Sequence, residues 1–198
     1  RIKHGARKEL VKSIRLEKRK DERNEMKKNL PAICFSGIFT KRNDSSIQHH
    51  SGFICLDFDG YEKNKELLQD KEQLTKNPYV YSVFISPSGK GLKVLVKIPQ
   101  DVDNHVKYFN SLQSHFDNPH FDPTCKNVSR VCYESYDPLL YINENSSVWD
   151  KIEEKDYEEK HIIKDLPTIP ITDENKIVDI LLIWWKKKIP YDRRAKKQ

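Results

Sequence analysis

The run Phe-Ile-Cys-Leu-Asp-Phe-Asp at residues 53–59 decides the fold. Its first four residues are apolar without alternation, which predicts a central strand covered on both faces. Side chains two residues apart on a strand point to the same face, so Asp57 and Asp59 project together. Acids at the end of a buried strand are costly unless they are paired or bound to metal. The run therefore predicts a carboxylate pair that holds divalent cations; the alternative is two acids at a fraying strand end beside Gly60.

The segments around this strand alternate between strand and helix patterns. Apolar runs bounded by turn residues predict strands at 32–36, 51–60, 79–86, 91–98 and 129–133. Helical spacing of apolar residues predicts helices over 65–76 and 102–116. The order β, β-α-β-β-α-β is typical of the split βαβ arrangement. We therefore expect an α/β (α+β) domain with one mixed sheet and helices packed on it.

Both ends of the chain are basic, and its middle is acidic. Residues 1–28 carry 12 Lys and Arg against 5 Asp and Glu, residues 186–198 carry 7 against 1, and residues 29–185 carry 17 against 24. We expect 1–28 to be a basic helical arm, with one helix over 7–28. Three interpretations of this segment are open: a solvated charged helix, an arm that binds a phosphate backbone, or a helix that docks on the rest of the protein. An acidic body argues against a simple nucleic-acid-coating protein and fits a metal-dependent enzyme better.

Residues 151–198 read as a linker followed by a C-terminal helix. Pro167 and Pro170 mark the linker, and Asp173 is placed to cap the helix. Trp184 and Trp185 in that helix are more readily packing residues than platforms on which bases stack.

Several classes of protein are excluded by composition. No apolar run approaches the roughly 18 residues that a membrane span needs, so we expect no membrane association. The four cysteines are scattered, with no CxxC pair and no His at zinc-ligand spacing. This pattern indicates reduced cysteines in a cytoplasmic protein rather than a disulfide framework or a zinc site.

A second candidate element is the run Ser-Pro-Ser-Gly-Lys-Gly-Leu-Lys at residues 86–93. Gly89 and Gly91 allow the backbone to approach a ligand closely and to expose its amides to an anion. Lys93 then begins a strand and can place its ammonium on a phosphate. The spacing is not that of a Walker A loop, and an ordinary hairpin turn is the alternative interpretation.

The third element is residues 121–138. Asp122 follows a predicted helix and precedes a predicted strand, a position from which a third carboxylate can reach the metals. Arg130 can pair with a phosphate or hold the acids in place. Asp137, just before Pro138, is more readily a turn former than a site residue.

These three elements together resemble the N-terminal domain of the BT4734-like (VirE N-terminal) family. The resemblance rests on residues 54–59, residues 86–93, Asp122, Asn127-Val-Ser-Arg130 and Ser135-Tyr-Asp-Pro138. It covers roughly residues 28–145. That family is grouped with the archaeo-eukaryotic primase superfamily. The resemblance implies a primase-like catalytic core with an RRM-like mixed sheet over 29–150, flanked by helical extensions.

The resemblance also implies site residues, metals and partners. It assigns catalysis and the binding of two Mg²⁺ or Mn²⁺ ions to Asp57, Asp59 and Asp122. It assigns nucleotide binding to Ser86, Ser88, Gly89, Lys93 and Arg130. The implied partners are a single-stranded DNA template, nucleoside triphosphates and, in a full-length protein, a helicase or a helical accessory domain. The superfamily usually has His at the position of Lys93, and a Lys is a point charge without the geometry or titration of imidazole.

The implied function is that of a DNA primase or primase-polymerase of a mobile-element or phage-type replication protein. Such an enzyme joins nucleotides by metal-dependent nucleotidyl transfer. The alternative is a nucleic-acid-binding replication module that kept the fold and lost the activity, which the Lys93 departure motivates. A third possibility is a glycosyltransferase with a DxD motif or a metal nuclease.

Overall fold

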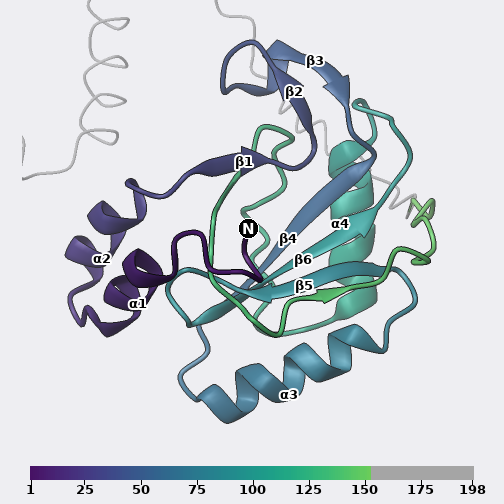
Figure 1. The fold of residues 1–198 in the computed structure, drawn as a ribbon. Coiled ribbons are helices and arrows are strands. Elements are labelled where there is room, and N and C mark those ends of the chain that lie inside the picture. The colour runs from purple at the N-terminus through teal and green to yellow at the C-terminus, as the bar shows by residue number, and fades with distance from the viewer. Residues whose placement is uncertain (153–198) are drawn as a thin grey trace, which may run out of the picture. The chain divides into compact units, whose positions relative to one another are not determined.

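A four-stranded antiparallel sheet forms the centre of the computed structural model, which describes residues 1–152 (Figure 1). Its strand order is β4-β6-β5-β8, with β4 at Phe53–Asp59, β5 at Val80–Ile85, β6 at Gly91–Lys97 and β8 at Tyr141–Ile142. Strand β6 lies between β4 and β5 and is antiparallel to both, while α3 (Asn64–Thr75) connects β4 to β5. The α/β class is thus confirmed, and β4, α3 and β5, with β6 between the two strands, form the first half of the predicted split βαβ arrangement.

The two predicted core helices cover one face of this sheet. Helix α3 and helix α4 (His105–Phe116) contribute Leu67, Phe109 and Leu112 to the largest apolar cluster. Strand β4 contributes Ile54, Leu56 and Phe58 to the same cluster, which follows from the two-residue period of a strand.

The other face of the sheet carries a second, smaller apolar cluster. Cys55, Phe84 and Leu95 pack there against Cys132, which lies on β7 (Val131–Tyr133). Strand β4 is therefore covered on both faces, as the unbroken apolar run at 53–56 predicts. None of the four cysteines forms a disulfide.

The expectation of a single mixed sheet was wrong. Strand β7 pairs with β1 (Ala32–Cys34) in a separate two-stranded sheet, and β2 (Gly37–Phe39) pairs with β3 (Ile47–His50) in another. All pairs of named strands within residues 1–152 are antiparallel. Strand β7 has no place beside β4, because residues 120–122 occupy that edge: the Asp59 amide donates to the His120 carbonyl at 2.7 Å.

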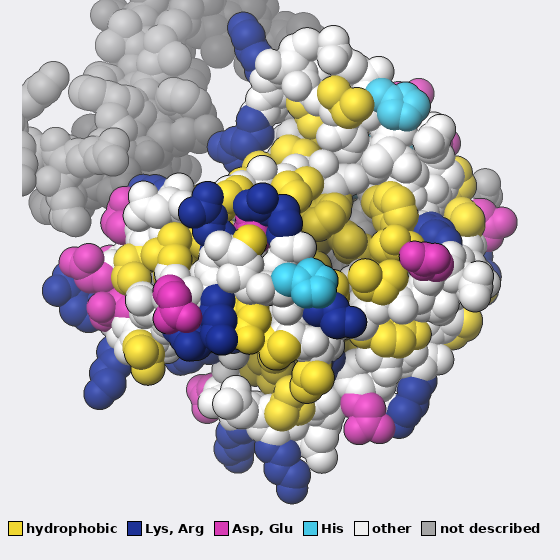
Figure 2. Space-filling model, viewed as in Figure 1, with side chains coloured by type: hydrophobic (Ala, Val, Ile, Leu, Met, Phe, Trp, Pro, Cys, Tyr) yellow, Lys and Arg dark blue, Asp and Glu magenta, His cyan; other side chains and the backbone are white. Residues whose placement is uncertain are grey.

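The N-terminal segment forms two helices instead of the predicted single helix over 7–28. Helix α1 spans Lys8–Leu16 and helix α2 spans Lys20–Lys27. The chain is extended between them, because Glu17 and Arg19 have β-region backbone angles. Lys, Arg, Asp and Glu side chains mix on the face around these helices (Figure 2).

Helix α1 docks on the rest of the domain, which was one of the three alternatives for this segment. Val11 and Ile14 are fully buried and form a third apolar cluster with Leu30. The Arg15 guanidinium donates to the carbonyls of Ser86 and Tyr136 at 3.2 and 2.8 Å. The described residues 1–152 therefore lie in one compact unit that includes both N-terminal helices.

Two remaining predictions concern membranes and the C-terminus. No helix among the described residues is long and apolar enough to cross a membrane. The predicted linker and C-terminal helix, with Trp184 and Trp185, lie outside the described residues, apart from the start of the linker.

Candidate functional site

Asp57 lies near the end of β4, directly opposite Lys93 of β6. The two residues are register partners in the antiparallel pair, and the Lys93 ammonium forms an ion pair with Asp57 Oδ2. Their side chains are only 16% and 15% exposed. Burial alone would lower the pKa of Lys93, but the Asp57 carboxylate and two nearby thiols outweigh it and raise that pKa. Lys93 is therefore protonated and places a fixed positive charge beside Asp57.

Backbone pairing at the free edge of β4 brings Asp122 to Asp57. The amide of Asp122 donates to the Asp57 carbonyl at 2.8 Å, and Phe121 forms a bridge with Phe58. The Phe121 ring packs against Phe58 and Phe109, with ring centroids 5.3 and 5.2 Å away. Packing of this aromatic residue thus holds the segment after α4 against the sheet and sets the position of Asp122.

Cys125 joins the two acids. Its thiol donates to Asp122 Oδ2 at 3.1 Å and lies 3.8 Å from Asp57 Oδ2. The three potential ligand atoms, from Asp57, Asp122 and Cys125, lie within 4.8 Å of one another. Arg130 donates to the Cys125 sulfur at 2.6 Å and lies 3.9 Å from Asp122. Arg130 therefore brings a second positive charge to this cluster, beside Cys125 and Asp122.

The protonation states within the cluster differ. Burial, the hydrogen bond to Asp122 and the charge of Asp57 raise the pKa of the Cys125 thiol to about 12. Burial would also raise the pKa of Asp122, but hydrogen bonds from Thr124 and Cys125 outweigh it and lower that pKa. At neutral pH the cluster thus presents a carboxylate at Asp122 beside a protonated thiol.

Asp59 stands apart from this three-ligand group. Its Oδ1 accepts the amide of Gly60 at 3.0 Å, and the residue is exposed. It lines a small pocket of about 80 Å³ together with Asp57, Lys93 and Lys27. Of the three acids predicted to hold metal, the structure thus brings Asp57 and Asp122 together. Asp59 shares only the small pocket with Asp57.

The loop at residues 86–91 closes one wall of this small pocket. The amide of Ser86 donates to the Gly91 carbonyl at 2.8 Å, so the loop is a hairpin turn. Ser86 and Ser88 line the pocket, and their hydroxyls are 3.0 Å apart. Gly89 has φ +72°, a backbone conformation that favours glycine. The two interpretations of this loop are compatible, because the turn that joins β5 to β6 also faces the acids.

Sequence reasoning missed two residues of the site. Cys125 was counted among unremarkable cysteines, although its place three residues after Asp122 puts it in the same turn. Lys27 comes from α2, far from the motifs in sequence, and burial lowers its pKa. Lys27 reaches the pocket of Asp59 only because the N-terminal helices dock on the domain, and no sequence motif predicts that docking.

Asp137 has a structural role, in line with its interpretation as a turn former. Its Oδ1 accepts the amide of Leu139 at 3.0 Å, and its Oδ2 accepts the Lys71 ammonium at 2.6 Å. The side chain is 2% exposed and does not line the small pocket.

Comparisons with known proteins give one match. No curated protein and no solved structure matches the chain significantly. The family described as the BT4734-like N-terminal domain matches residues 25–141, which contain Lys27, Asp57, Lys93, Asp122 and Arg130. This match spans more than half of the chain and all three sequence elements that carry the resemblance. The protein therefore belongs to the BT4734-like N-terminal domain family.

Proposed function

We propose that this domain is a metal-dependent nucleotidyltransferase of the primase or primase-polymerase type, acting on a single-stranded DNA template. The observation that carries the proposal is the meeting of Asp57 and Asp122, 65 positions apart in sequence, beside a hairpin that presents Lys93 and Ser88. Acids, a lysine and a serine-glycine turn in one small pocket suit the handling of a triphosphate.

The donor atoms fit divalent magnesium or manganese. Asp57 and Asp122 offer carboxylate oxygens, which both ions prefer, and Asp59 offers a third on the pocket side. The Cys125 thiol is a poor ligand for such ions while it remains protonated. When bound, the ions would activate the attacking hydroxyl and stabilise charge on the phosphates.

The cationic side chains and Ser88 would bind and position the triphosphate. Lys93 and Lys27 line the pocket on either side of the acids and would neutralise the triphosphate. The Ser88 hydroxyl would orient it through a hydrogen bond. Arg130, held on the Cys125 sulfur, would keep Asp122 in place and meet the phosphate charge from the far side.

The experiment is incorporation of labelled nucleoside triphosphates on a single-stranded DNA template with Mg²⁺ or Mn²⁺. Asp57→Asn and Asp122→Asn should each lower the rate about 100-fold or more, because the site loses a charge that acts in the transition state. Asp103→Asn, an exposed carboxylate on the far loop, is the matched control and should keep the wild-type rate. Equal rates for wild type and Asp57→Asn would refute the proposal.

The ion pair between Lys93 and Asp57 favours a second candidate function. The ammonium occupies the carboxylate oxygen that a cation would need, so the domain can be a nucleic-acid-binding module without activity. In that case the wild-type protein binds single-stranded DNA but incorporates no nucleotide with either metal. Incorporation that depends on Asp57 excludes this second candidate.

A further inference from the structure

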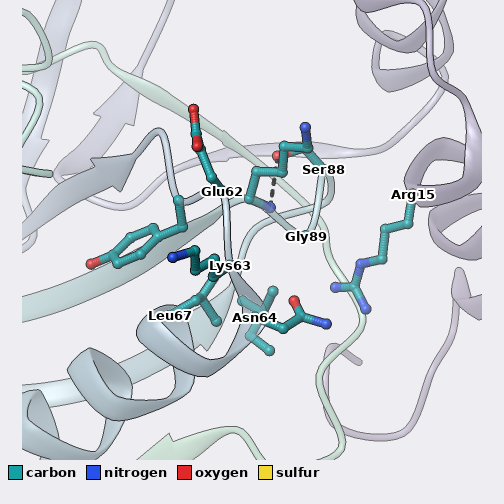
Figure 3. Close-up of a pocket in the computed structure, with 10 residues that line it drawn as sticks. Arg15, Glu62, Lys63, Asn64, Leu67, Ser88 and Gly89 are labelled. Carbon is teal, nitrogen blue, oxygen red and sulfur yellow. Dashed lines mark hydrogen bonds between the residues drawn. The ribbon is translucent and has the colours of Figure 1, made fainter.

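A second, larger cavity lies on the other side of the Ser88–Gly89 turn. Its volume is about 470 Å³, against about 80 Å³ for the pocket at the acids. Ser88 lines both, so the turn is a shared wall between them. Figure 3 shows the cavity between this turn, the start of α3 with Lys63 and Asn64, and Arg15 on the opposite side.

Arg15 brings a half-buried positive charge to this cavity. Its stem packs on Gly89: a Cβ at that glycine would lie 3.2 Å from Arg15 Cγ. Two carbonyls fix the guanidinium, yet its Nε is buried and has no hydrogen-bond partner in the described part of the chain. Burial lowers the pKa of Arg15, and no carboxylate within residues 1–152 forms an ion pair with it. The charge that Arg15 brings to the cavity lining is therefore not cancelled by an ion pair.

Two further cations line the cavity and lack ion pairs as well. Lys63 and Lys90 are exposed, and neither forms an ion pair with a carboxylate among the described residues. Some exposed cations on this domain are neutralised locally, as Arg19 is by Glu22 and Lys76 is by Glu72. The lining thus holds three positive charges against one negative charge, that of Glu62.

The start of α3 adds backbone donors to the same cavity. The helix has 12 residues, begins at Asn64 and has no side-chain cap on its first amides. Free amides and the helix dipole at this end favour a negative charge. Leu67 and Ile85 also line the cavity, but Tyr61 is only 2% exposed and stacks on His120, so it offers little face to a base. The chemistry points to phosphate rather than to a nucleobase.

We propose that this cavity, lined by Arg15, Lys63 and Lys90, binds backbone phosphate of the single-stranded nucleic acid whose end reacts at Asp57 and Asp122. The inference rests on the proposed function for the identity of the reacting strand. The small pocket takes the triphosphate, and the cavity behind the shared turn holds the strand beside it. A phosphate there meets the charge of the Arg15 guanidinium and pairs with the two lysines.

The test is the salt dependence of single-stranded DNA binding by the full chain, measured by fluorescence anisotropy. Lys63→Gln/Lys90→Gln removes two phosphate contacts, so the slope of log K against log salt should fall by about 1.4. At 0.1 M salt this corresponds to binding weaker by roughly 25-fold. Lys76→Gln/Lys107→Gln removes the same charge at the far end of α3 and on α4, and it should leave slope and affinity near the wild-type values.

A second arm separates strand phosphate from nucleotide phosphate. Binding of a nucleoside triphosphate with Mn²⁺ should be unchanged in Lys63→Gln/Lys90→Gln. A wild-type DNA slope in this variant, or a loss of triphosphate binding instead of DNA binding, would overturn the inference. The DNA measurement involves no incorporation, so it stands apart from the Asp57→Asn rate that tests the proposed function.

Discussion

At the scale of single residues, the pairing of Asp57 with Lys93 dominates the candidate site. A cross-strand register places a lysine opposite an acid, and both side chains are largely buried. Opposite charges in such a place stabilise each other, and each becomes costly when the other is removed. A divalent cation at Asp57 must therefore displace the ammonium of Lys93, which is then free to meet a phosphate.

We predict that Lys93→Gln unfolds more easily than wild type without metal and recovers when Mn²⁺ is added. Without the lysine, the Asp57 carboxylate lacks its countercharge, which should cost about 2 kcal/mol of unfolding free energy. The cation no longer competes with an ammonium, so Mn²⁺ should raise the Tm of the variant more than that of wild type. Differential scanning calorimetry with and without Mn²⁺ measures both effects.

Lys90→Gln is the control for this prediction, because Lys90 is exposed and three residues away on the same hairpin. It should leave both the Tm and its response to Mn²⁺ unchanged. If Mn²⁺ stabilises Lys93→Gln no more than wild type, the lysine does not compete with metal for Asp57.

Sequence alone could place some of these residues and not others. Asp57, Asp59 and Lys93 lie in short motifs whose strand pattern is local, so their faces follow from a two-residue period. The meeting of Asp57 with Asp122 depends on backbone pairing of residues 120–122 with the edge of β4. Lys27 reaches the pocket through tertiary docking of α2. Contacts of this kind leave no periodic trace in the chain.

At the scale of elements, a buried ion pair joins α3 to the turn before β8. The Lys71 ammonium donates to Asp137 Oδ2 at 2.6 Å and to the Leu139 carbonyl at 2.7 Å. The side chains of Lys71 and Asp137 are 9% and 2% exposed. Asp137 also accepts the amide of Ile85, so this one carboxylate links β5, α3 and the β8 turn.

We predict that Lys71→Met lowers the unfolding free energy by about 3 kcal/mol, because it leaves the buried Asp137 charge without its partner. Lys76→Met on the same helix breaks only an exposed pair with Glu72, with side chains 58% and 69% exposed. That change should cost less than about 1 kcal/mol. Urea unfolding of both variants provides the comparison, and equal losses would show that the Lys71 pair adds no more than a surface pair.

A pair of buried histidines joins the β2–β3 hairpin to α4. The Gly52 amide donates to His50 Nδ1 at 3.1 Å, so His50 carries its proton on Nε2 and donates it to His105 Nδ1, also 3.1 Å away. A further proton on either ring would face another donor. Burial, chiefly, lowers the pKa of both residues, that of His105 to about 4, despite the nearby carboxylates of Asp101 and Asp44.

We predict that acid weakens the domain through this histidine pair. An unfolded histidine takes up a proton near pH 6.5, whereas folded His105 does so only near pH 4. The stability is therefore complete above about pH 6.5 and is lost as the pH falls toward 4, by up to about 3 kcal/mol. Urea unfolding across this range should show a smaller loss for His105→Asn, whose amide oxygen can still accept from His50.

The protonation of the two imidazoles can also be measured directly. An NMR titration of wild type should show His50 and His105 neutral at pH 6, below the pKa of about 6.5 that a histidine has in an unfolded chain. A wild-type stability loss that matches that of His105→Asn would assign the acid effect to the carboxylates instead.

The elements differ in how well the sequence predicts them. Helices α3 and α4 and strands β4 to β6 have clear apolar periods, and all were expected within a few residues of their bounds. The β2–β3 hairpin was missed because its strands have only three and four residues, and the few apolar residues in them, Ile38, Phe39 and Ile47, do not make a pattern. Pairing of β7 with β1 was also missed, since the two strands are about 100 residues apart in the chain and their pairing leaves no local pattern.

At the scale of the whole molecule, the basic N-terminal segment belongs to the fold. Its charge pattern alone favours a solvated helix over an arm or a docking helix, because only Val11 and Ile14 mark the buried side of α1. Docking of α1 and α2 is what completes both pockets, with Arg15 in the larger and Lys27 in the smaller. Two of the positive charges of residues 1–28 therefore line the two pockets and are not part of a free basic arm.

We predict that α1 unfolds together with the central sheet. Ile14 is fully buried in the cluster with Val11 and Leu30, so Ile14→Ala should lower the unfolding free energy by about 2–4 kcal/mol. Leu16→Ala, on the same helix but 80% exposed, should change it by less than about 0.5 kcal/mol. Native-state hydrogen exchange should protect the Ile14 amide as strongly as that of Leu56 in β4, because a docked helix opens only when the core opens. Fast exchange at Ile14 beside slow exchange at Leu56 would make the segment a separate arm, and Arg15 would then not stay at the larger cavity.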